Sequence, residues 1–465
     1  MCKLRYSLVA ITLIGLLLMT SGCFQIIDQN TYNPAVNISS TAVTNSPNKF
    51  IAIITGAYAG ERFGASIAAF NNVDGAGHQG IAVGAIASGG PEKSNSGSVY
   101  VISFINLQTR YRLDGQKAGD QFGHSLATVG DLNGDQIFEF IVGAPAGDVE
   151  GFTDAGYVGL YSGRDGKRLG YYPGDTNNLR LGHSLAGLGD INGDRIPDFG
   201  IGTPFSEQEG KINAGMVVLE LSHDLPFERQ PLKIWGEAAG DNFGWSIAGI
   251  GDVSGDGIPD IAIGAPGVKL SNGTNVGRVY ILSGNGGTTL YKIDGTESEE
   301  RFGFSVVGLD DIDGDKFPDF VVGAPAVDLS DKIPADTDDQ RAGKAYVFSG
   351  KNGNLIFKLE GFPQGNLFGF SLAGRDVDGD GFSDIMVGDP SAGQGHGSVH
   401  IFSGKDGKSL YIFINQATRK DAVGSALNCE IDINRDGCPD VIVGAYSAPN
   451  IEARPTGMVF VLSMP

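Results

Sequence analysis

Short apolar runs alternate with clusters of glycine and aspartate over most of this chain. The stretch 301–325, RFGFSVVGLDDIDGDKFPDFVVGAP, shows the pattern, with one apolar run on each side of an acidic loop. The run after such a loop, for example 260–264, is short, β-branched and bounded by turn residues, which is typical of a buried strand. Further strands are expected at 277–282, after a glycine, and at 290–293. The pattern therefore predicts units of four short strands joined by tight turns.

This four-strand unit recurs seven times from Phe50 onward. A serine stands two positions after the opening glycine in six copies, and Ala426 replaces it in the last copy. The openings are Phe63-Gly64, Phe122-Gly123, Leu181-Gly182, Phe243-Gly244, Phe302-Gly303, Phe368-Gly369 and Val423-Gly424. Because repeats of this kind with four strands each suit a ring of radial sheets, we expect an all-β, seven-bladed β-propeller of four-stranded antiparallel blades.

The two ends of the repeat region distinguish a closed ring from an open solenoid. Residues 50–54 resemble a fourth strand that stands before the first opening, whereas the C-terminal end, 457–462, stops at a third strand. We therefore expect the N-terminal strand to complete the last blade. Closure of this kind removes exposed strand edges that a solenoid would have to cap.

The repeats resemble the FG-GAP repeat of integrin α-subunit propellers and of related bacterial surface proteins. The residues that carry the resemblance are the opening Phe-Gly, the aspartate loop and a closing Gly-Ala-Pro at 143–145, 264–266 and 323–325. The resemblance covers all seven units. It implies a seven-bladed propeller with calcium in loops on one face and partner binding on the other.

Six of the loops carry polar side chains at positions 1, 3, 5 and 9, and the backbone carbonyl of position 7 would add a fifth oxygen. Calcium takes about six to eight oxygen ligands, so alternate loop residues can surround one ion. The predicted ligands are Asp131, Asn133, Asp135, Ile137 and Glu139; Asp190, Asn192, Asp194, Ile196 and Asp198; Asp252, Ser254, Asp256, Ile258 and Asp260; Asp311, Asp313, Asp315, Phe317 and Asp319; Asp376, Asp378, Asp380, Phe382 and Asp384; and Asp432, Asn434, Asp436, Cys438 and Asp440. Asp and Gly also favour turns that bind no metal, but six loops in one register favour about six structural Ca²⁺ ions. Loops 311–319 and 376–384, with four carboxylates each, should bind most tightly.

Not all the loops are equivalent. The loop of the first unit, 72–80, keeps one carboxylate and is expected to be empty, because its positions 1, 3, 5, 7 and 9 hold Asn72, Asp74, Ala76, His78 and Gly80. Glu139 is one methylene longer than the aspartate that the other loops have at position 9. Position 6 is glycine in three loops but Gln136, Arg195 and Lys316 in the others. If that position needs a positive φ, each non-glycine residue costs roughly 1–2 kcal/mol.

The charge of the chain argues against nucleic acid as a partner. The 465 residues include 33 basic and 54 acidic ones, for a net charge of −21, and no cluster of Lys and Arg is present. Binding to phosphates needs such a cluster. Carboxylates crowded into one loop also repel one another, and six calcium ions would bring the net charge to −9.

The first 23 residues have the pattern of an export signal. Lys3 and Arg5 precede an apolar run, 8–19, that is shorter than the roughly 20 residues needed to span a bilayer. The small residues before Cys23 resemble a bacterial lipoprotein lipobox, which implies that Cys23 is lipidated. An ordinary signal peptide cut nearby, with Cys23 incidental, is the alternative.

The stretch 24–48 is rich in Asn, Thr and Ser and predicts a flexible tether before the propeller at 49–465. The expected location is the cell envelope or cell surface, with the lipid anchor as the only contact with the membrane. In a Gram-negative host, the absence of aspartate after Cys23 favours the outer membrane.

The remaining chemistry-bearing residues carry no catalytic signature. Cys429 and Cys438 are compatible with a disulfide in an oxidising compartment or with two free thiols. His124 and His183 occupy one repeat position that holds Trp245, Phe304 or Phe370 in three other units, which marks them as packing residues, whereas His396 and His400 could share one face of a third strand. The chain has no nucleophile elbow, phosphate-binding loop or zinc-protease motif.

These expectations favour recognition or adhesion at a cell surface. The partner would be an unidentified surface protein or polysaccharide, bound by blade-connecting loops on the face away from calcium. The alternatives are a polysaccharide-acting enzyme with a site at the propeller channel and a structural subunit of a surface complex. A cluster of Lys, Tyr or His at one mouth of the channel would favour the enzyme.

Overall fold

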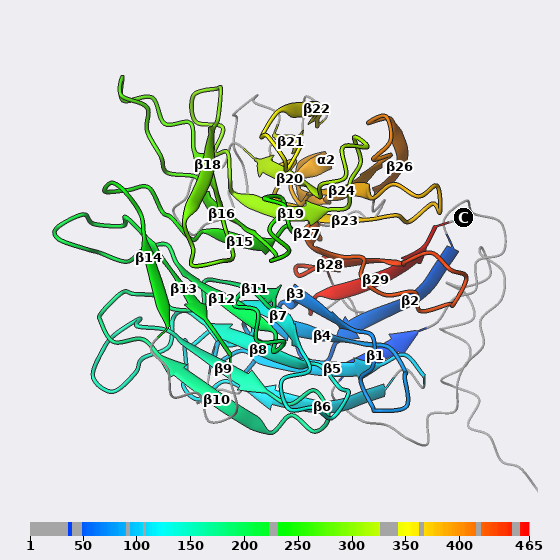
Figure 1. The fold of residues 1–465 in the computed structure, drawn as a ribbon. Coiled ribbons are helices and arrows are strands. Elements are labelled where there is room, and N and C mark those ends of the chain that lie inside the picture. Colours follow the sequence, from blue (N-terminus) through cyan, green and yellow to red (C-terminus); the bar gives the residue numbers. More distant parts are fainter. Residues whose placement is uncertain are drawn as a thin grey trace, which may run out of the picture.

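The chain forms seven antiparallel sheets arranged in a ring (Figure 1). The first strand of each sheet lies near the centre of the ring and the fourth at its rim (Figure 1). The predicted seven-bladed β-propeller is therefore confirmed. The computed structural model describes residues 36–39, 49–89, 94–105, 108–222, 231–325, 343–361, 367–414, 420–448 and 456–464.

Each blade has four strands that follow one another from the centre to the rim. Blades 1 to 3 comprise β3 (Phe63–Phe70), β4 (Gly80–Ala85), β5 (Ser98–Ser103) and β6 (Gln108–Asp114); β7 (Ser125–Gly130), β8 (Glu139–Ala144), β9 (Tyr157–Tyr161) and β10 (Arg168–Pro173); and β11 (Ser184–Gly189), β12 (Asp198–Thr203), β13 (Met216–Glu220) and β14 (Leu232–Trp235). Blades 4 to 6 comprise β15 (Ser246–Gly249), β16 (Ile261–Ala265), β17 (Arg278–Leu282) and β18 (Thr289–Asp294); β19 (Ser305–Leu309), β20 (Asp319–Ala324), β21 (Lys344–Phe348) and β22 (Leu355–Glu360); and β23 (Ser371–Arg375), β24 (Asp384–Asp389), β25 (Ser398–Phe402) and β26 (Ser409–Ile414). Blade 7 comprises β27 (Val423–Asn428), β28 (Val441–Ala445), β29 (Met458–Ser463) and β2 (Lys49–Gly56).

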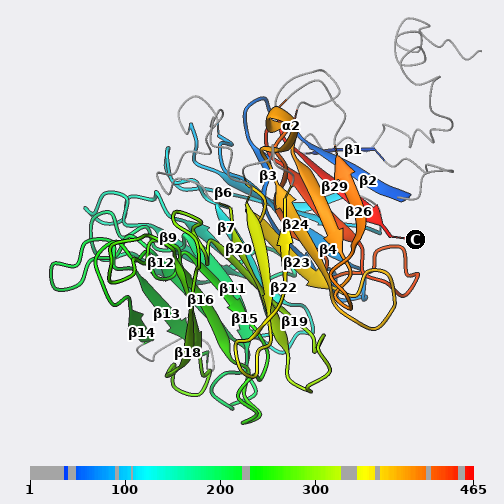
Figure 2. The same cartoon turned by 90° about the horizontal axis from the view of Figure 1, so that it is seen from above.

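The N-terminal strand β2 closes the ring, as the ends of the repeat region predicted. It pairs antiparallel with β29, so that Ile54 lies opposite Val459, and the two strands run side by side in both views (Figures 1 and 2). Ile54 also packs with Phe63 and Ile81 of blade 1. The first strands of successive blades contact one another all the way round, including β27 with β3. Strands from opposite ends of the chain therefore complete one sheet.

A fifth strand, β1 (Val36–Ser39), pairs antiparallel with the outer edge of β2. It lies in the stretch 24–48, where the sequence predicted a tether, and these four residues form an extended segment paired with β2. The outer edge of β2 offers unpaired backbone N–H and C=O groups, and an extended segment can pair with them whatever its side chains are. The predicted signal peptide and Cys23 lie outside the described residues.

The core of the propeller lies between neighbouring blades. All six residues of β8 are buried, as are all six of β20, because the second and third strands are covered by a blade on each side. Phe70 and Val99 of blade 1, for example, pack with Phe122 and Phe140 of blade 2. Burial on both faces explains the continuous apolar runs, which lack the alternation of a half-exposed strand.

The repeated serine joins each blade to the next one. Ser125 donates its Oγ hydrogen to the carbonyl of Gly182 in the next opening, at 2.7 Å. Equivalent bonds are made by Ser66, Ser184, Ser246, Ser305 and Ser371. A Cβ added to Gly143 would lie 2.2 Å from the same Gly182 carbonyl, so this approach requires a glycine. Ala426 lacks the hydroxyl, and blade 7 therefore meets blade 1 without this bond.

Within the part of the chain that the structure describes, one short helix interrupts the strands. It is α2 (Ala392–Gly395), a single turn between β24 and β25 in blade 6. Throughout the described residues, no helix is both long enough and apolar enough to cross a membrane.

Candidate metal centre

The six acidic loops lie at one end of the inner strands. Each joins the first strand of its blade to the second, as loop 131–139 does between β7 and β8. The hairpins between third and fourth strands come to the same face, because the strands alternate in direction. The Phe-Gly openings stand at the opposite ends of the inner strands. Repetition of one topology thus places all the predicted ligands on one face, and the ligands of each predicted site come from a single loop.

The aspartate at position 1 shapes the turn of each loop. In loop 311–319, Asp311 Oδ1 accepts hydrogen bonds from the N–H groups of Gly314 at 2.7 Å and Asp315 at 3.1 Å. Its Oδ2 accepts one from the N–H of Lys316 at 2.7 Å. The N–H groups of positions 5 and 6 donate to position 1 in the other five loops as well.

The carboxylate at position 9 is buried in all six loops. Asp319 accepts hydrogen bonds from the backbone N–H of Ile312 at 2.8 Å and from that of Gly350, just past β21, at 3.0 Å. The exposed fraction is 0% for Asp319 and at most 1% for the equivalent Glu139, Asp198, Asp260, Asp384 and Asp440. Position 9 therefore ties the acidic loop to the second and third strands of its blade.

Burial changes the protonation of these position-9 groups. It raises the pKa of Asp319 to about 6 and that of Asp384 to about 7, although backbone N–H donors act in the opposite direction and neighbouring loop carboxylates add to the rise. Burial likewise raises the pKa of Glu139, Asp198 and Asp440 to about 7. In each case the nearby charges of the same loop disfavour the ionised form, and a divalent cation would relieve this repulsion.

In two loops, three carboxylates converge closely enough to share one ion. Oxygen atoms of Asp311, Asp313 and Asp315 all lie within 4.8 Å of one another, as do those of Asp376, Asp378 and Asp384. These are the two loops with four carboxylates. In the loop of blade 7, Asp440 Oδ1 is buried and has no hydrogen-bond partner in the part of the chain that the structure describes. The donor set is oxygen throughout, which fits a hard cation such as calcium.

Position 5 is tied to the backbone of position 7. Phe317 N–H donates to Asp315 Oδ1 at 3.0 Å, and the same bond recurs in the other five loops. This bond orients the peptide of position 7 and leaves the second oxygen of position 5 for another partner. The carbonyl ligand predicted at position 7 remains a prediction.

Position 6 has a positive φ, as the loops with glycine there suggested. Gln136, Arg195 and Lys316 have φ values of 68°, 72° and 75°, against 86° for Gly257. A Cβ on Gly257 would meet nothing within 4 Å, so the cost of the larger residues is conformational strain alone, roughly 1–2 kcal/mol each. Arg435 at position 4 of the last loop has φ 61°, a strained position that the sequence analysis missed.

The loop of blade 1 is closed by its own side chains. His78 Nδ1 lies 2.6 Å from Asp74 Oδ2, and the carbonyl of His78 accepts a hydrogen bond from Val73 N–H at 2.7 Å. The His78 carbonyl is at position 7, where the other six loops have their predicted carbonyl ligand. Burial acts to raise the pKa of Asp74, but the N–H of Ala76 and the ring of His78 outweigh it and lower the pKa. A Cβ on Gly80 would lie 2.5 Å from a backbone oxygen, so position 9 has no room for a carboxylate.

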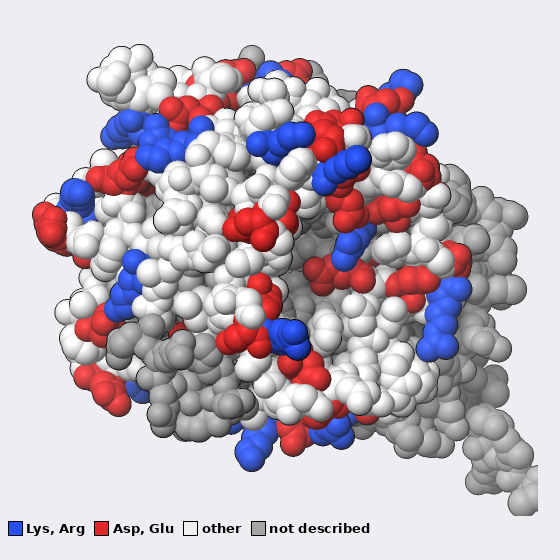
Figure 3. All heavy atoms as spheres, in the orientation of Figure 1, with Lys and Arg blue, Asp and Glu red and all other residues white. Residues whose placement is uncertain are grey.

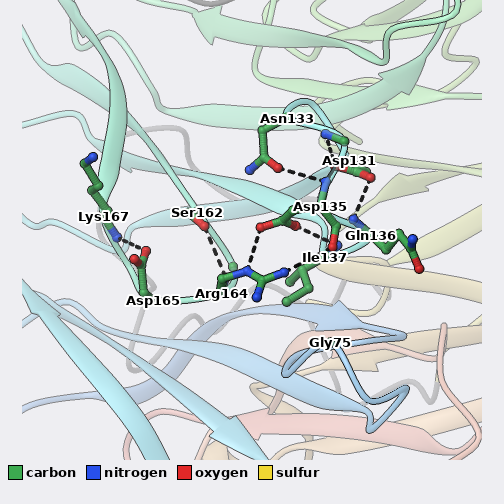
Figure 4. Close-up of polar contacts among 12 residues, drawn as sticks. Gly75, Asp131, Asn133, Asp135, Gln136, Ile137, Ser162, Arg164, Asp165 and Lys167 are labelled. Carbon is green, nitrogen blue, oxygen red and sulfur yellow. Dashed lines mark hydrogen bonds and ion pairs between the residues drawn. The ribbon is translucent and has the colours of Figure 1, made fainter.

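Arg164 is a site residue that the sequence analysis missed. It lies in the hairpin between β9 and β10 and points at the loop of its own blade, where its Nε donates to Asp135 Oδ2 at 2.8 Å (Figure 4). Its Nη2 donates to the backbone carbonyl of Asp135 at 3.2 Å. The signal in the sequence was the recurrence of a basic residue after Ser-Gly, as in Ser349-Gly350-Lys351 and Ser403-Gly404-Lys405.

The two cysteines of the propeller are free thiols, which decides between the two states that the sequence left open. Cys429 is buried, and burial raises the pKa of its thiol well above the usual range. Cys438 is partly exposed at position 7 of the last loop, and its Sγ lies close to Gly379 of the neighbouring loop.

The histidines at the repeat position pack as predicted. His124 and His183 form a row of neighbouring rings with Trp245, Phe304 and Phe370, and successive centroids are 4.7–5.4 Å apart. The row follows the starts of the inner strands, on the face opposite the acidic loops.

The expectation that His396 and His400 share a strand face is wrong. His396 caps α2, whereas His400 is buried in β25 beside Ser398 and Phe368. Burial lowers the pKa of His400 to about 4.

These features define the chain as a seven-bladed propeller, and four of its blades match a repeat family. The FG-GAP repeat family matches residues 122–161, 243–282, 302–348 and 368–402, which form parts of blades 2, 4, 5 and 6. These four matches support an integrin-like FG-GAP family, as the resemblance of the sequence indicated.

The similar curated proteins are integrin α-chains. The chain is 35% identical to integrin alpha-PS2 of Drosophila melanogaster over 246 residues, which is 48% of this chain and 16% of that one. It is 33% identical to integrin alpha-5 of Xenopus laevis over 221 residues, which is 45% of this chain and 20% of that one. The chain thus spans about a fifth of the length of these relatives.

A solved structure shares the fold at much lower identity. The crystal structure of BBS1N in complex with ARL6DN aligns with a TM-score of 0.51 and 10% identity, over 85% of this chain and 91% of that one. At this identity the likeness concerns the fold alone.

Proposed function

We propose that this protein is an exported, lipid-anchored recognition or adhesion module whose propeller is stabilised by calcium. The proposal is carried by one observation, the six acidic loops held in one register on one face of an integrin-like ring. The integrin relatives support a role at a cell surface, and the N-terminal pattern that ends at Cys23 supports export and a lipid anchor.

Calcium would be structural in this role. Positions 1, 3, 5 and 9 of each acidic loop supply side-chain oxygens and position 7 supplies a carbonyl, so the ion would join the first and second strands of one blade. An ion that binds only the folded ring stabilises it by about 2.7 kcal/mol when its free concentration is a hundredfold above the dissociation constant. The chain's own carboxylates already hold the turn through backbone N–H groups, which keeps the oxygens close together before an ion arrives.

Partner binding is assigned to the opposite face. The connections between second and third strands and between blades lie there, and they carry the exposed apolar side chains of Tyr58, Phe152 and Ile212 on blades 1, 2 and 3. Figure 3 shows the other face, that of the acidic loops, where described side chains of both charges are interspersed around a central hollow. The exposed apolar groups on the face opposite the acidic loops suit a surface protein or a polysaccharide better than nucleic acid, which needs clustered positive charge.

The proposal is tested by presenting the full chain to arrays of surface proteins and polysaccharides, with calcium and with excess chelator. We expect retention on one of these classes in calcium and weaker retention in chelator. Ile212→Ser should weaken the retention, whereas Leu355→Ser, which changes an exposed residue on the rim strand β22, should leave it unchanged. No retention on any ligand in either buffer would contradict the recognition function.

A further inference from the structure

The hairpins between third and fourth strands lie directly against the acidic loops of their own blades. A Cβ on Gly163 would lie 2.1 Å from the carbonyl of Phe138, at position 8 of loop 131–139. The equivalent glycines of blades 4, 5 and 6 make the same approach to position 8, and their Cβ atoms would lie 2.0 Å from its carbonyl. This close approach holds the residue after each glycine beside the loop.

That residue differs from blade to blade. It is Arg164 in blade 2, Asn285 in blade 4, Lys351 in blade 5 and Lys405 in blade 6. The set includes one guanidinium, two amines and one neutral amide on the same backbone turn, next to loops with the same ligand pattern.

The contact with the loop weakens from Arg164 to Lys405 to Lys351. Arg164 makes the two hydrogen bonds to Asp135 described above (Figure 4). Lys405 Nζ lies 3.7 Å from Asp380 Oδ2. Lys351 Nζ instead lies over the ring of Phe317, 4.6 Å from its centre.

In blade 2 the guanidinium of Arg164 bonds to Asp135 Oδ2, the oxygen of position 5 that would otherwise be open to a calcium ion. Ile137 N–H donates to Asp135 Oδ1 at 2.9 Å, so Arg164 takes the remaining oxygen. In the same loop Asn133 Nδ2 donates to Glu139 Oε1 at 2.7 Å. Loop 131–139 therefore has an internal partner for each of these carboxylates, and a fixed positive charge beside a cation site repels the cation.

We propose that the residue after Ser-Gly sets the calcium affinity of the loop beside it, and that Arg164 makes loop 131–139 the last of the six to fill. This inference rests on the proposed calcium binding and goes beyond it. It ranks the calcium affinities of loops that share one ligand pattern by a residue that lies outside those loops. In the absence of calcium, Arg164 neutralises part of the loop and preserves its shape.

The test counts bound ions on the full chain by native mass spectrometry as free calcium is raised. Arg164→Asn copies the residue of blade 4 and should bring the last ion on at a roughly threefold to tenfold lower calcium concentration, since a surface ion pair and a repelled charge have modest energies. Arg164→Lys should give an intermediate shift. Lys167→Asn is the matched control, because Lys167 lies in the same hairpin but contacts Asp165 only through its backbone N–H, at 3.0 Å, and its side chain extends away from the loop (Figure 4).

The assignment to loop 131–139 is checked in an Asp131→Ala background, which should bind one ion fewer and show no shift with Arg164→Asn. An unchanged curve for Arg164→Asn, a shift equal to that of Lys167→Asn, or a shift that persists in the Asp131→Ala background would overturn the inference while calcium binding stood. A wild-type chain that binds no ion would contradict the calcium proposal itself and the inference with it.

Discussion

Loop 72–80 of blade 1 and loop 311–319 of blade 5 have related backbone turns but different hydrogen-bond partners at position 2. In both, the side chain at position 1, Asn72 or Asp311, accepts hydrogen bonds from the N–H groups of positions 4 and 6. The turn thus needs an oxygen acceptor at position 1, and an amide serves as well as a carboxylate.

The difference lies at the other end of the loop. The N–H of position 2 donates to the buried carboxylate of Asp319 in blade 5 but to the carbonyl of His78 in blade 1. His78 also takes Asp74 as its partner. The comparison teaches that the same turn can be completed by a buried carboxylate at position 9 or by the carbonyl of position 7, and that the position-9 carboxylate separates the two cases.

The largest expected effect is that of removing calcium from all six acidic loops. Excess chelator should lower the Tm of the full chain by on the order of 10 °C, because the linked stabilisation of each site is lost. Differential scanning calorimetry measures the shift. An unchanged Tm would count against calcium in the folded ring.

A single substitution should then distinguish the two loops. Asp315→Ala is expected to reduce the number of bound ions by one per chain and to lower the Tm in calcium by about 1–4 °C, because it removes a ligand from loop 311–319. Asp74→Ala should leave the ion count unchanged. Metal analysis of the dialysed proteins measures the number of bound calcium ions per chain. An unchanged number for Asp315→Ala would remove loop 311–319 from the set of calcium sites.

The pH dependence should reverse sign with calcium. In chelator, Asp319 and Asp384 have a pKa of about 6 and about 7, above the ordinary value, so the folded ring binds protons more tightly than the unfolded chain does. Stability should therefore rise as pH falls from about 7 towards about 4. With calcium, protons compete with the ion, and stability should fall over the same range.

Thermal unfolding at a series of pH values, with and without chelator, measures this effect, and we expect a shift of a few degrees. The same slope in both buffers would show that the position-9 carboxylates do not bind the ion.

The smallest expected effect is that of adding a carboxylate to the closed loop. Ala76→Asp restores position 5 of loop 72–80 but should add no bound ion, because Val73 still occupies the carbonyl of His78 and Gly80 leaves no space for a position-9 side chain. Metal analysis of the variant and of the wild-type protein compares their numbers of bound ions. A gain of one ion would mean that charge alone decides binding.

Much of the fold could be predicted because it rests on local patterns that repeat. The apolar runs of β8 and β20, the opening Phe-Gly and the strand Lys49–Gly56 standing before the first unit were enough to predict seven blades and their closure. The grouping of acidic positions within each loop could be predicted for the same reason, since the positions are neighbours in the chain.

Contacts between segments far apart in the sequence were not accessible in this way. Arg164 meets Asp135 across 29 residues, and β1 meets β2 through backbone groups that carry no sequence signal. The exclusion of a carboxylate at Gly80 likewise depends on a neighbouring strand.

The sequence by itself determined that this protein is a closed ring of seven similar sheets with an acidic turn in six of them, because burial on two faces and turn chemistry are set residue by residue. Only the tertiary structure decided which acidic oxygens converge, which already have Arg164 or His78 as a partner, and which lie deep enough for burial to raise their pKa. The physical reason is that charge balance in a loop depends on what the surrounding hairpins and strands place within a few ångströms of it.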